Sequence, residues 1–146
     1  EELRAGIQQV PAAGGVYIVL RERLDLPEFL ETNPGGRFKG RDPTVSPEAL
    51  NANWVTGASV LYIGKAKIGR LRTRLREFAD FGAGRPIGHW GGRLIWQLAD
   101  SGELLAAWKE TPAGVDPKLV EAELIARFRS AYGKPPFANN PHLLGR

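Results

Sequence analysis

Two short runs of β-branched and aromatic residues predict strands on either side of a long polar stretch. Residues 16–20 read Val-Tyr-Ile-Val-Leu after a pair of glycines, and residues 60–63 read Val-Leu-Tyr-Ile before Gly64. Apolar runs of this length, bounded by glycine, are typical of buried strands. A third run, Leu-Leu-Ala-Ala-Trp at 104–108, predicts one more strand.

Between the second and third predicted strands, apolar residues recur at helical spacing. Leu71, Leu75 and Phe78 stand at i, i+4 and i+7, which predicts an amphipathic helix over residues 70–81. Apolar residues spaced by four predict a second, shorter helix over residues 91–99.

The last predicted helix spans residues 116–132, begins at Asp-Pro and is followed by Gly133. Its core-facing stripe on a helical wheel comprises Val120, Leu124, Ile125, Phe128, Ala131 and Tyr132. Glu121 falls inside this stripe, whereas Glu123 falls outside it and can pair with Arg127. A buried carboxylate is costly unless it is paired or holds a metal. Glu121 is therefore the partner of a buried arginine, a side chain exposed at the helix end, or a metal ligand.

Residues 23–58 are rich in proline and glycine and contain few apolar residues. We predict that they form a long insertion with one or two short helices, one of them capped by Ser46 before Pro47. Around the insertion, the order of elements is strand, strand, helix, helix, strand, helix. This order predicts a single domain over residues 1–146, of the α/β (α+β) class, with a small three-stranded sheet flanked by helices.

The composition narrows the chemistry that this domain can carry. The 146 residues are 42% hydrophobic and 25% charged, as in globular domains, and include no cysteine and two histidines. Disulfide scaffolds, thiolate metal sites and sites with several histidine ligands are thereby excluded. No apolar run approaches the roughly 18 residues of a membrane span, and no signal-peptide pattern opens the chain. We therefore expect a cytoplasmic protein with no membrane partner.

The positive charge is confined to one segment of the chain. The formal net charge is +4, but residues 61–93 contain 8 basic and 2 acidic residues, a net charge of +6. Such a segment suggests a polyanionic partner. A solvated, arginine-rich helix face explains the same charge equally well.

Several motifs in a fixed order resemble the GIY-YIG nuclease superfamily. Gly15-Val16-Tyr17 lies on the first predicted strand and Tyr62-Ile63-Gly64 on the second, followed by an arginine-bearing helix and later by Glu-x-x-Leu-Ile. The chain is most similar to the incision domain of the bacterial excision-repair nuclease, in which the second strand runs into Gly-Lys-Ala-Lys, the sequence of residues 64–67 here. The resemblance covers residues 14–22 and 59–140 and implies a GIY-YIG endonuclease-like fold.

The resemblance implies catalytic roles for six residues. These are Tyr17, Tyr62, Lys65, Arg74, Glu121 and Asn139. Glu121 would hold one Mg²⁺ (or Mn²⁺), an ion that accepts a single carboxylate and keeps most of its waters. Tyr17 would act as the general base if Lys65 and Arg74 lower its pKa from about 10. Arg74 would bind the phosphate oxygens through its planar fork of donors.

At three places, the resemblance does not decide which residue belongs to the site. Arg72 is a rival of Arg74, because two extra residues separate Lys67 from the helix. Asn140 is a rival of Asn139, and His89 is a candidate because some family members use a histidine in this region. Further phosphate contacts are expected from Lys67, Arg70, Arg72 and Arg76.

The resemblance implies a metal-dependent endonuclease that hydrolyses phosphodiester bonds in double-stranded or branched DNA. A domain this small offers few surfaces for sequence readout, so we expect a second copy of the chain or a partner protein. Two alternatives stay open: a nucleic-acid-binding module without cleavage, and a protein-interaction domain whose basic helix binds an acidic partner. We also expect residues 23–58 to cover or flank the site, with Arg37, Lys39 and Arg41 as a basic loop that tunes substrate choice.

Overall fold

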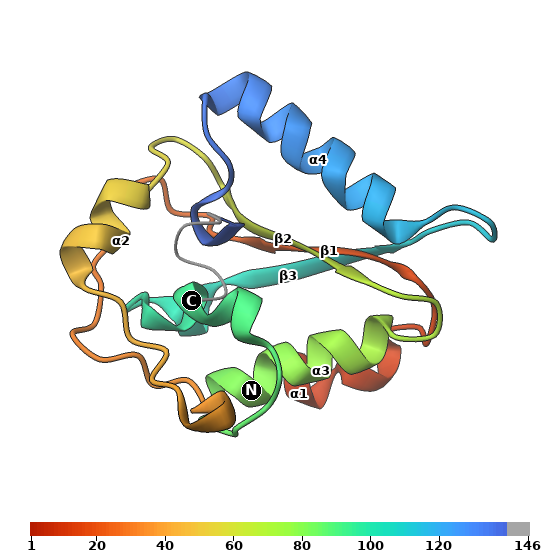
Figure 1. Ribbon diagram of the computed structural model, residues 1–146, viewed down its shortest axis with the longest axis horizontal. Coiled ribbons are helices and arrows are strands. Elements are labelled where there is room, and N and C mark those ends of the chain that lie inside the picture. The colour runs from red at the N-terminus through yellow and green to blue at the C-terminus, as the bar shows by residue number, and fades with distance from the viewer. Residues whose placement is uncertain (140–146) are drawn as a thin grey trace.

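The structure is a computed structural model that describes residues 1–139. Its centre is a three-stranded antiparallel sheet in the order β2-β1-β3, flanked by helices (Figure 1). The strands are β1 (Gly15–Leu20), β2 (Val60–Ala66) and β3 (Leu105–Glu110). The predicted mixed class, with three strands and flanking helices, is confirmed.

Helices cover both faces of the sheet. α1 (Glu2–Ala5) and α3 (Leu71–Gly82) lie on one face, α4 (Pro117–Tyr132) lies on the other, and α2 (Pro47–Asn53) lies beyond the start of β2 (Figure 1). The described part of the chain also contains five 3-10 helices: η1 (Ile7–Gln9), η2 (Phe38–Gly40), η3 (Trp90–Gln97), η4 (Ser101–Glu103) and η5 (Phe137–Asn139). Within residues 1–139, no helix combines the length and the apolar character needed to cross a membrane.

Two helical predictions need correction. The segment predicted as a helix over residues 91–99 is the 3-10 helix η3, because Gly91 and Gly92 are weak formers of α-helix. In α4, Phe128 is buried as predicted, but Ala131 and Tyr132 are exposed. The reason is visible in Figure 1, where α4 rises away from the sheet toward its C-terminal end.

The ends of α4 follow the sequence closely. The Asp116 carboxylate accepts a hydrogen bond from the backbone N–H of Lys118 at 2.9 Å, and Gly133 takes the left-handed conformation at φ 80°. Glu123 accepts a hydrogen bond from Arg127 at 2.6 Å on the exposed side of the helix. The predicted cap, C-terminal glycine and surface ion pair are all confirmed.

Glycines allow the strands to approach one another as closely as they do. Tyr17 on β1 stands opposite Gly64 on β2, and a Cβ atom at Gly64 would lie 2.3 Å from Cζ of the Tyr17 ring. A Cβ atom at Gly15 would lie 2.4 Å from the carbonyl oxygen of Lys109 on β3. Both motif glycines are therefore required by close packing against neighbouring strands.

The insertion is folded onto the core. Its residues Leu50, Trp54 and Val55 are buried, against the expectation of a mostly polar segment. The buried amide of Gln97 on η3 donates to the carbonyl oxygens of Leu30 and Val45, at 2.8 and 2.6 Å, and accepts from the N–H of Val45 at 3.0 Å. These three hydrogen bonds attach the middle of the insertion to η3.

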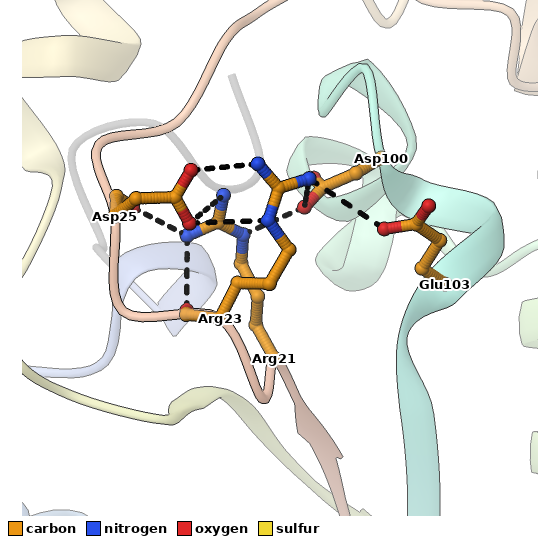
Figure 2. A network of polar contacts seen from close by, with 5 residues as sticks. All are labelled: Arg21, Arg23, Asp25, Asp100 and Glu103. Atoms are coloured by element: carbon orange, nitrogen blue, oxygen red, sulfur yellow. Dashed lines mark hydrogen bonds and ion pairs between the residues drawn. The ribbon is translucent and has the colours of Figure 1, made fainter.

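A buried arginine attaches the start of the insertion (Figure 2). Arg21 follows β1, and its side chain is 4% exposed. Its Nε donates to the Asp100 carboxylate at 2.8 Å, and one of its terminal nitrogens donates to the carbonyl oxygens of Arg23 and Asp25. The side chains of Arg23 and Glu103 form the exposed rim of this network, 3.7 Å apart.

We expect Asp100→Asn to lower the free energy of unfolding by about 2 kcal/mol, because it leaves the buried Arg21 guanidinium with only the half-exposed Asp25 carboxylate, 3.5 Å away, as an anionic partner. Urea unfolding followed by circular dichroism measures this change. The matched control is Glu103→Gln, which removes a carboxylate from the exposed rim and should leave stability unchanged. Equal stability of the two variants would contradict the role given to the buried pair.

Candidate functional site

A cleft of about 410 Å³ opens beside β2, one of the two edge strands of the sheet. Its lining residues come from β1, β2, the turn after β2, α3 and α4. They are Tyr17, Tyr62, Lys65, Ala66, Lys67, Arg70, Arg74 and Glu121. The structure therefore brings five of the six predicted catalytic positions into one cleft.

The position of β2 at the edge of the sheet lets the cleft receive side chains from both faces. Tyr17 stands opposite Gly64 and Tyr62 stands opposite Val19, so both phenols lie on the face covered by α3. Lys65 stands opposite Val16 and therefore lies on the other face, with α4. The outer edge of β2 is where these two sets of side chains meet.

The two tyrosines and His89 form a buried aromatic group. The hydroxyl group of Tyr17 lies 2.7 Å from Nε2 of His89, and both residues are almost completely buried. The Tyr62 ring lies about 6 Å from both other rings, and Phe78 of α3 packs against His89 at 5.3 Å. Among residues 1–139, Nδ1 of His89 has no hydrogen-bond partner. His89 is only one of several candidates in the sequence, and the structure places it against Tyr17.

Burial keeps all three of these rings uncharged. It raises the pKa of Tyr17 well above 10, and the neighbouring Tyr62 adds to the shift, whereas Arg74 acts in the opposite direction. Burial also raises the pKa of Tyr62 to about 12. Burial, assisted by the charge of Arg74, lowers the pKa of His89 to about 3. The condition stated for Tyr17 as the general base, a pKa lowered by Lys65 and Arg74, is not met, because desolvation outweighs Arg74.

A carboxylate that the sequence reasoning overlooked lies between two arginines of the cleft. Glu77 accepts hydrogen bonds from Arg74 and, at 3.1 Å, from Arg70. Arg74 also donates to the carbonyl oxygen of Gly88 at 3.1 Å, just before His89. The i, i+3 spacing from Arg74 to Glu77 is the sequence signal for this contact.

Glu121 faces the cleft from α4, as the helical wheel predicts. Its side chain is 18% exposed, and Oε1 lies 3.2 Å from Nζ of Lys65. Within residues 1–139, no group of three histidine, cysteine or acidic side chains gathers to chelate an ion. Glu121 supplies the one carboxylate of the cleft lining. An oxygen donor of this kind fits Mg²⁺, because Mg²⁺ can be coordinated by one carboxylate and several waters.

Asn139 lies outside the cleft lining and closes the edge of β2. Its Oδ1 accepts from the backbone N–H of Ile63 at 2.8 Å, and its Nδ2 donates to the Ile63 carbonyl oxygen at 2.9 Å. It thus pairs with β2 as a neighbouring strand would, next to Tyr62. The rival Asn140 lies outside the described residues.

The predicted phosphate contacts divide into two groups. Lys67 and Arg70 line the cleft, whereas Arg76 is exposed on α3 outside its lining. Arg72 is directed elsewhere, because its guanidinium donates to the carbonyl oxygens of Val10 at 2.6 Å and Gln8 at 3.4 Å. Of the two rival arginines, Arg74 is therefore the one in the cleft.

The insertion reaches the site indirectly. None of the cleft-lining residues in the described chain comes from 23–58, so of the two expected positions, covering or flanking the site, the insertion does not cover this cleft. Instead it packs against residues 85–88: a Cβ atom at Gly36 would lie 1.7 Å from the Arg85 carbonyl oxygen, and one at Gly88 would lie 3.4 Å from the Phe38 ring. The insertion therefore supports the loop that carries His89.

Comparisons of the chain with protein-family models, with curated proteins and with solved structures found no match.

We expect acid to destabilise the protein partly through His89. Burial holds the folded-state pKa near 3, below the 6.5 of an unfolded histidine. Between these values the unfolded chain binds a proton that the folded chain does not. The contribution of neutral His89 is therefore complete above pH 6.5 and is lost as the pH falls toward 3.

Urea unfolding at pH 7, 6, 5 and 4 tests this expectation against the variant His89→Phe. The free energy of unfolding should fall more steeply in the wild type than in the variant, by up to about 1 kcal/mol per pH unit. The variant loses the hydrogen bond to Tyr17 at every pH, so the slopes are compared and not the absolute values. Parallel slopes would contradict the burial of a neutral His89.

Proposed function

We propose that this protein is a metal-dependent endonuclease that hydrolyses DNA phosphodiester bonds through a GIY-YIG-type site. The observation that carries the proposal is the single cleft that gathers Tyr17, Tyr62, Lys65, Arg74 and Glu121 from four separate elements. The resemblance depends on the order of motifs along the chain. Their meeting at one place is a second, spatial argument for the same chemistry.

Phosphodiester hydrolysis needs an activated water, neutralisation of the phosphate charge and a stabilised leaving oxygen. Glu121 would hold the Mg²⁺ (or Mn²⁺), which when bound supplies charge neutralisation and stabilises the leaving oxygen. Arg74 projects into the same cleft, where its guanidinium can bind two phosphate oxygens in place of Glu77. Lys65, beside Glu121, adds a second positive charge for the phosphate.

Tyr17 and His89 offer a path for the proton of the attacking water. As the water oxygen bonds to phosphorus, its proton passes to the Tyr17 oxygen, and the Tyr17 proton passes to Nε2 of His89 over the 2.7 Å hydrogen bond. Tyr17 stays neutral at the end of this step and His89 becomes positively charged. A bound phosphate favours that charge, because a nearby anion raises the pKa of an imidazole. The buried phenol never has to persist as a phenolate.

One observation favours the alternative of a DNA-binding module without cleavage. Three cations of the cleft are paired within the protein, Arg70 and Arg74 with Glu77 and Lys65 with Glu121. In that reading, these ion pairs are structural and the DNA contacts come from the exposed Lys67. Cleavage assays separate the two functions.

The decisive assay is nicking of supercoiled plasmid DNA in the presence of Mg²⁺. We expect EDTA to abolish nicking, and Glu121→Gln and Tyr17→Phe each to slow it by about 100-fold or more, the range seen when one catalytic group is removed. Glu123→Gln is the matched control on the same helix, outside the cleft, and should keep the wild-type rate. Binding of DNA without nicking in Mg²⁺ or Mn²⁺ would contradict the proposed nuclease activity and support the binding module.

We further expect Glu77→Gln to tighten DNA binding by about fivefold, because it frees the guanidinium groups of Arg70 and Arg74 from an internal carboxylate. Fluorescence anisotropy in EDTA measures binding without cleavage. Glu123→Gln removes the same charge away from the cleft and corrects for the change in net charge. Unchanged or weaker binding would mean that Glu77 orients the arginines and does not compete with phosphate.

A further inference from the structure

Next to the cleft, two arginines share one indole ring. Trp90 directly follows His89 at the start of η3. The guanidinium carbon of Arg93 lies 4.7 Å from the centre of the Trp90 ring, and that of Arg41, from the insertion, lies 4.8 Å away. A cation over an indole face is a favourable contact, but two cations at one ring repel each other.

Arg93 is buried without an anion. It is 3% exposed, and its guanidinium donates to the carbonyl oxygen of Trp90 at 3.1 Å. Within residues 1–139, neither Arg93 nor Arg41 forms an ion pair, and the nearby Asp42 pairs with Arg37. Burial and the charge of Arg41 lower the pKa of Arg93 to about 10. Buried charges are normally paired, so this cluster is adapted to an external anion.

The Trp90 ring adds an unused donor. Its indole N–H is buried and has no acceptor in the described part of the chain. Such groups are uncommon in folded proteins and call for a physical reason. A phosphate group offers acceptor oxygens to both kinds of donor, the guanidinium forks and the indole N–H.

The cluster is held in place by a chain of hydrogen bonds that starts in the interior and ends at the surface. Nδ2 of Asn33 donates to the Arg93 carbonyl oxygen at 2.7 Å, and the N–H of Asn33 donates to Oγ1 of Thr44 at 3.0 Å. The N–H of Thr44 in turn donates to Asp42 at 2.9 Å, next to Arg41. The backbone that carries Arg41 is thereby fixed to the backbone that carries Arg93.

Three consecutive residues connect the cluster to the cleft. The Gly88 carbonyl oxygen accepts a hydrogen bond from Arg74, and the His89 ring is hydrogen-bonded to Tyr17. The Trp90 ring contacts the guanidinium groups of Arg41 and Arg93. We propose that Arg41, Arg93 and Trp90 form a second phosphate site, which binds a phosphodiester group of the same nucleic-acid strand beside the one cleaved. The choice of ligand rests on the proposed function, whereas the anion site itself does not.

DNA binding in EDTA tests the proposal, with Arg41→Gln as the main variant. Arg41 is exposed, so the variant should fold, which circular dichroism checks. We expect at least fivefold weaker binding, and a slope of log affinity against log salt that is shallower by about 0.9, the value for one lost phosphate contact. Arg37→Gln removes an arginine of the same loop that is already paired with Asp42, and should leave the slope unchanged. Equal effects of the two variants would overturn the proposal, as would a lower melting temperature of Arg41→Gln with unchanged binding.

A second measurement does not depend on DNA. In a titration with inorganic phosphate, the NMR signal of the Trp90 indole N–H, assigned by its loss in Trp90→Phe, should shift and saturate. The shift should persist in Glu121→Gln and disappear in Arg41→Gln. If DNA neither binds nor is cleaved but this shift occurs, the anion site stands and the nuclease proposal fails. Absence of the shift together with unchanged DNA binding of Arg41→Gln overturns the site.

Discussion

The buried hydroxyl group of Tyr17 needs a hydrogen-bond partner, and the chain is arranged to supply one. A buried O–H without a partner is destabilising, and Nε2 of His89 lies 2.7 Å away. The contact requires Gly64 under the Tyr17 ring, because any side chain there would occupy the same space. It also requires Gly92, where a Cβ atom would lie 2.8 Å from Nδ1 of His89. Two glycines far apart in the sequence thus leave the space in which the hydrogen bond between Tyr17 and His89 forms.

The same burial shapes the electrostatics of the cleft. Desolvation keeps Tyr17 and His89 neutral, so the fixed charges near them belong to Arg74, Lys65 and two carboxylates. Glu77 and Glu121 each neutralise part of that positive charge. In both ion pairs the side chains remain partly exposed to solvent. Partly exposed ion pairs are weak. Under the proposed function, a phosphate and a metal ion would therefore replace these internal partners without a large cost in free energy.

Local patterns in the sequence were sufficient for the elements and for much of the cleft. The strand motifs place Tyr17 and Tyr62, and the helical wheel places Glu121 inside a mostly apolar stripe. What escaped prediction depends on partners distant in sequence, such as Gln97 with Leu30 and Val45. The sequence alone could not decide whether Arg72 or Arg74 lies in the cleft. That outcome depends on the N-terminal segment, which accepts hydrogen bonds from Arg72. Periodicity reports which side of a helix faces inward, but not which loop packs against it.

Segment net charge is a poor guide to where a phosphate chain would lie, because paired cations contribute little. Among the cations of the insertion, Arg23 and Arg37 form ion pairs, whereas Lys39 and Arg41 form none within residues 1–139. Lys67 and Arg70 lie at the N-terminal end of α3, and Trp90 packs against Phe81 near its C-terminal end, with ring centres 6.2 Å apart. The 12 residues of α3 span about 18 Å at 1.5 Å per residue. A duplex strand presents a phosphate about every 3.4 Å of its axis, so this length corresponds to about five phosphates. Under the proposed function, cations at the two ends of α3, with Arg74 between them, would therefore give a strand a direction across the cleft as well as an affinity for it.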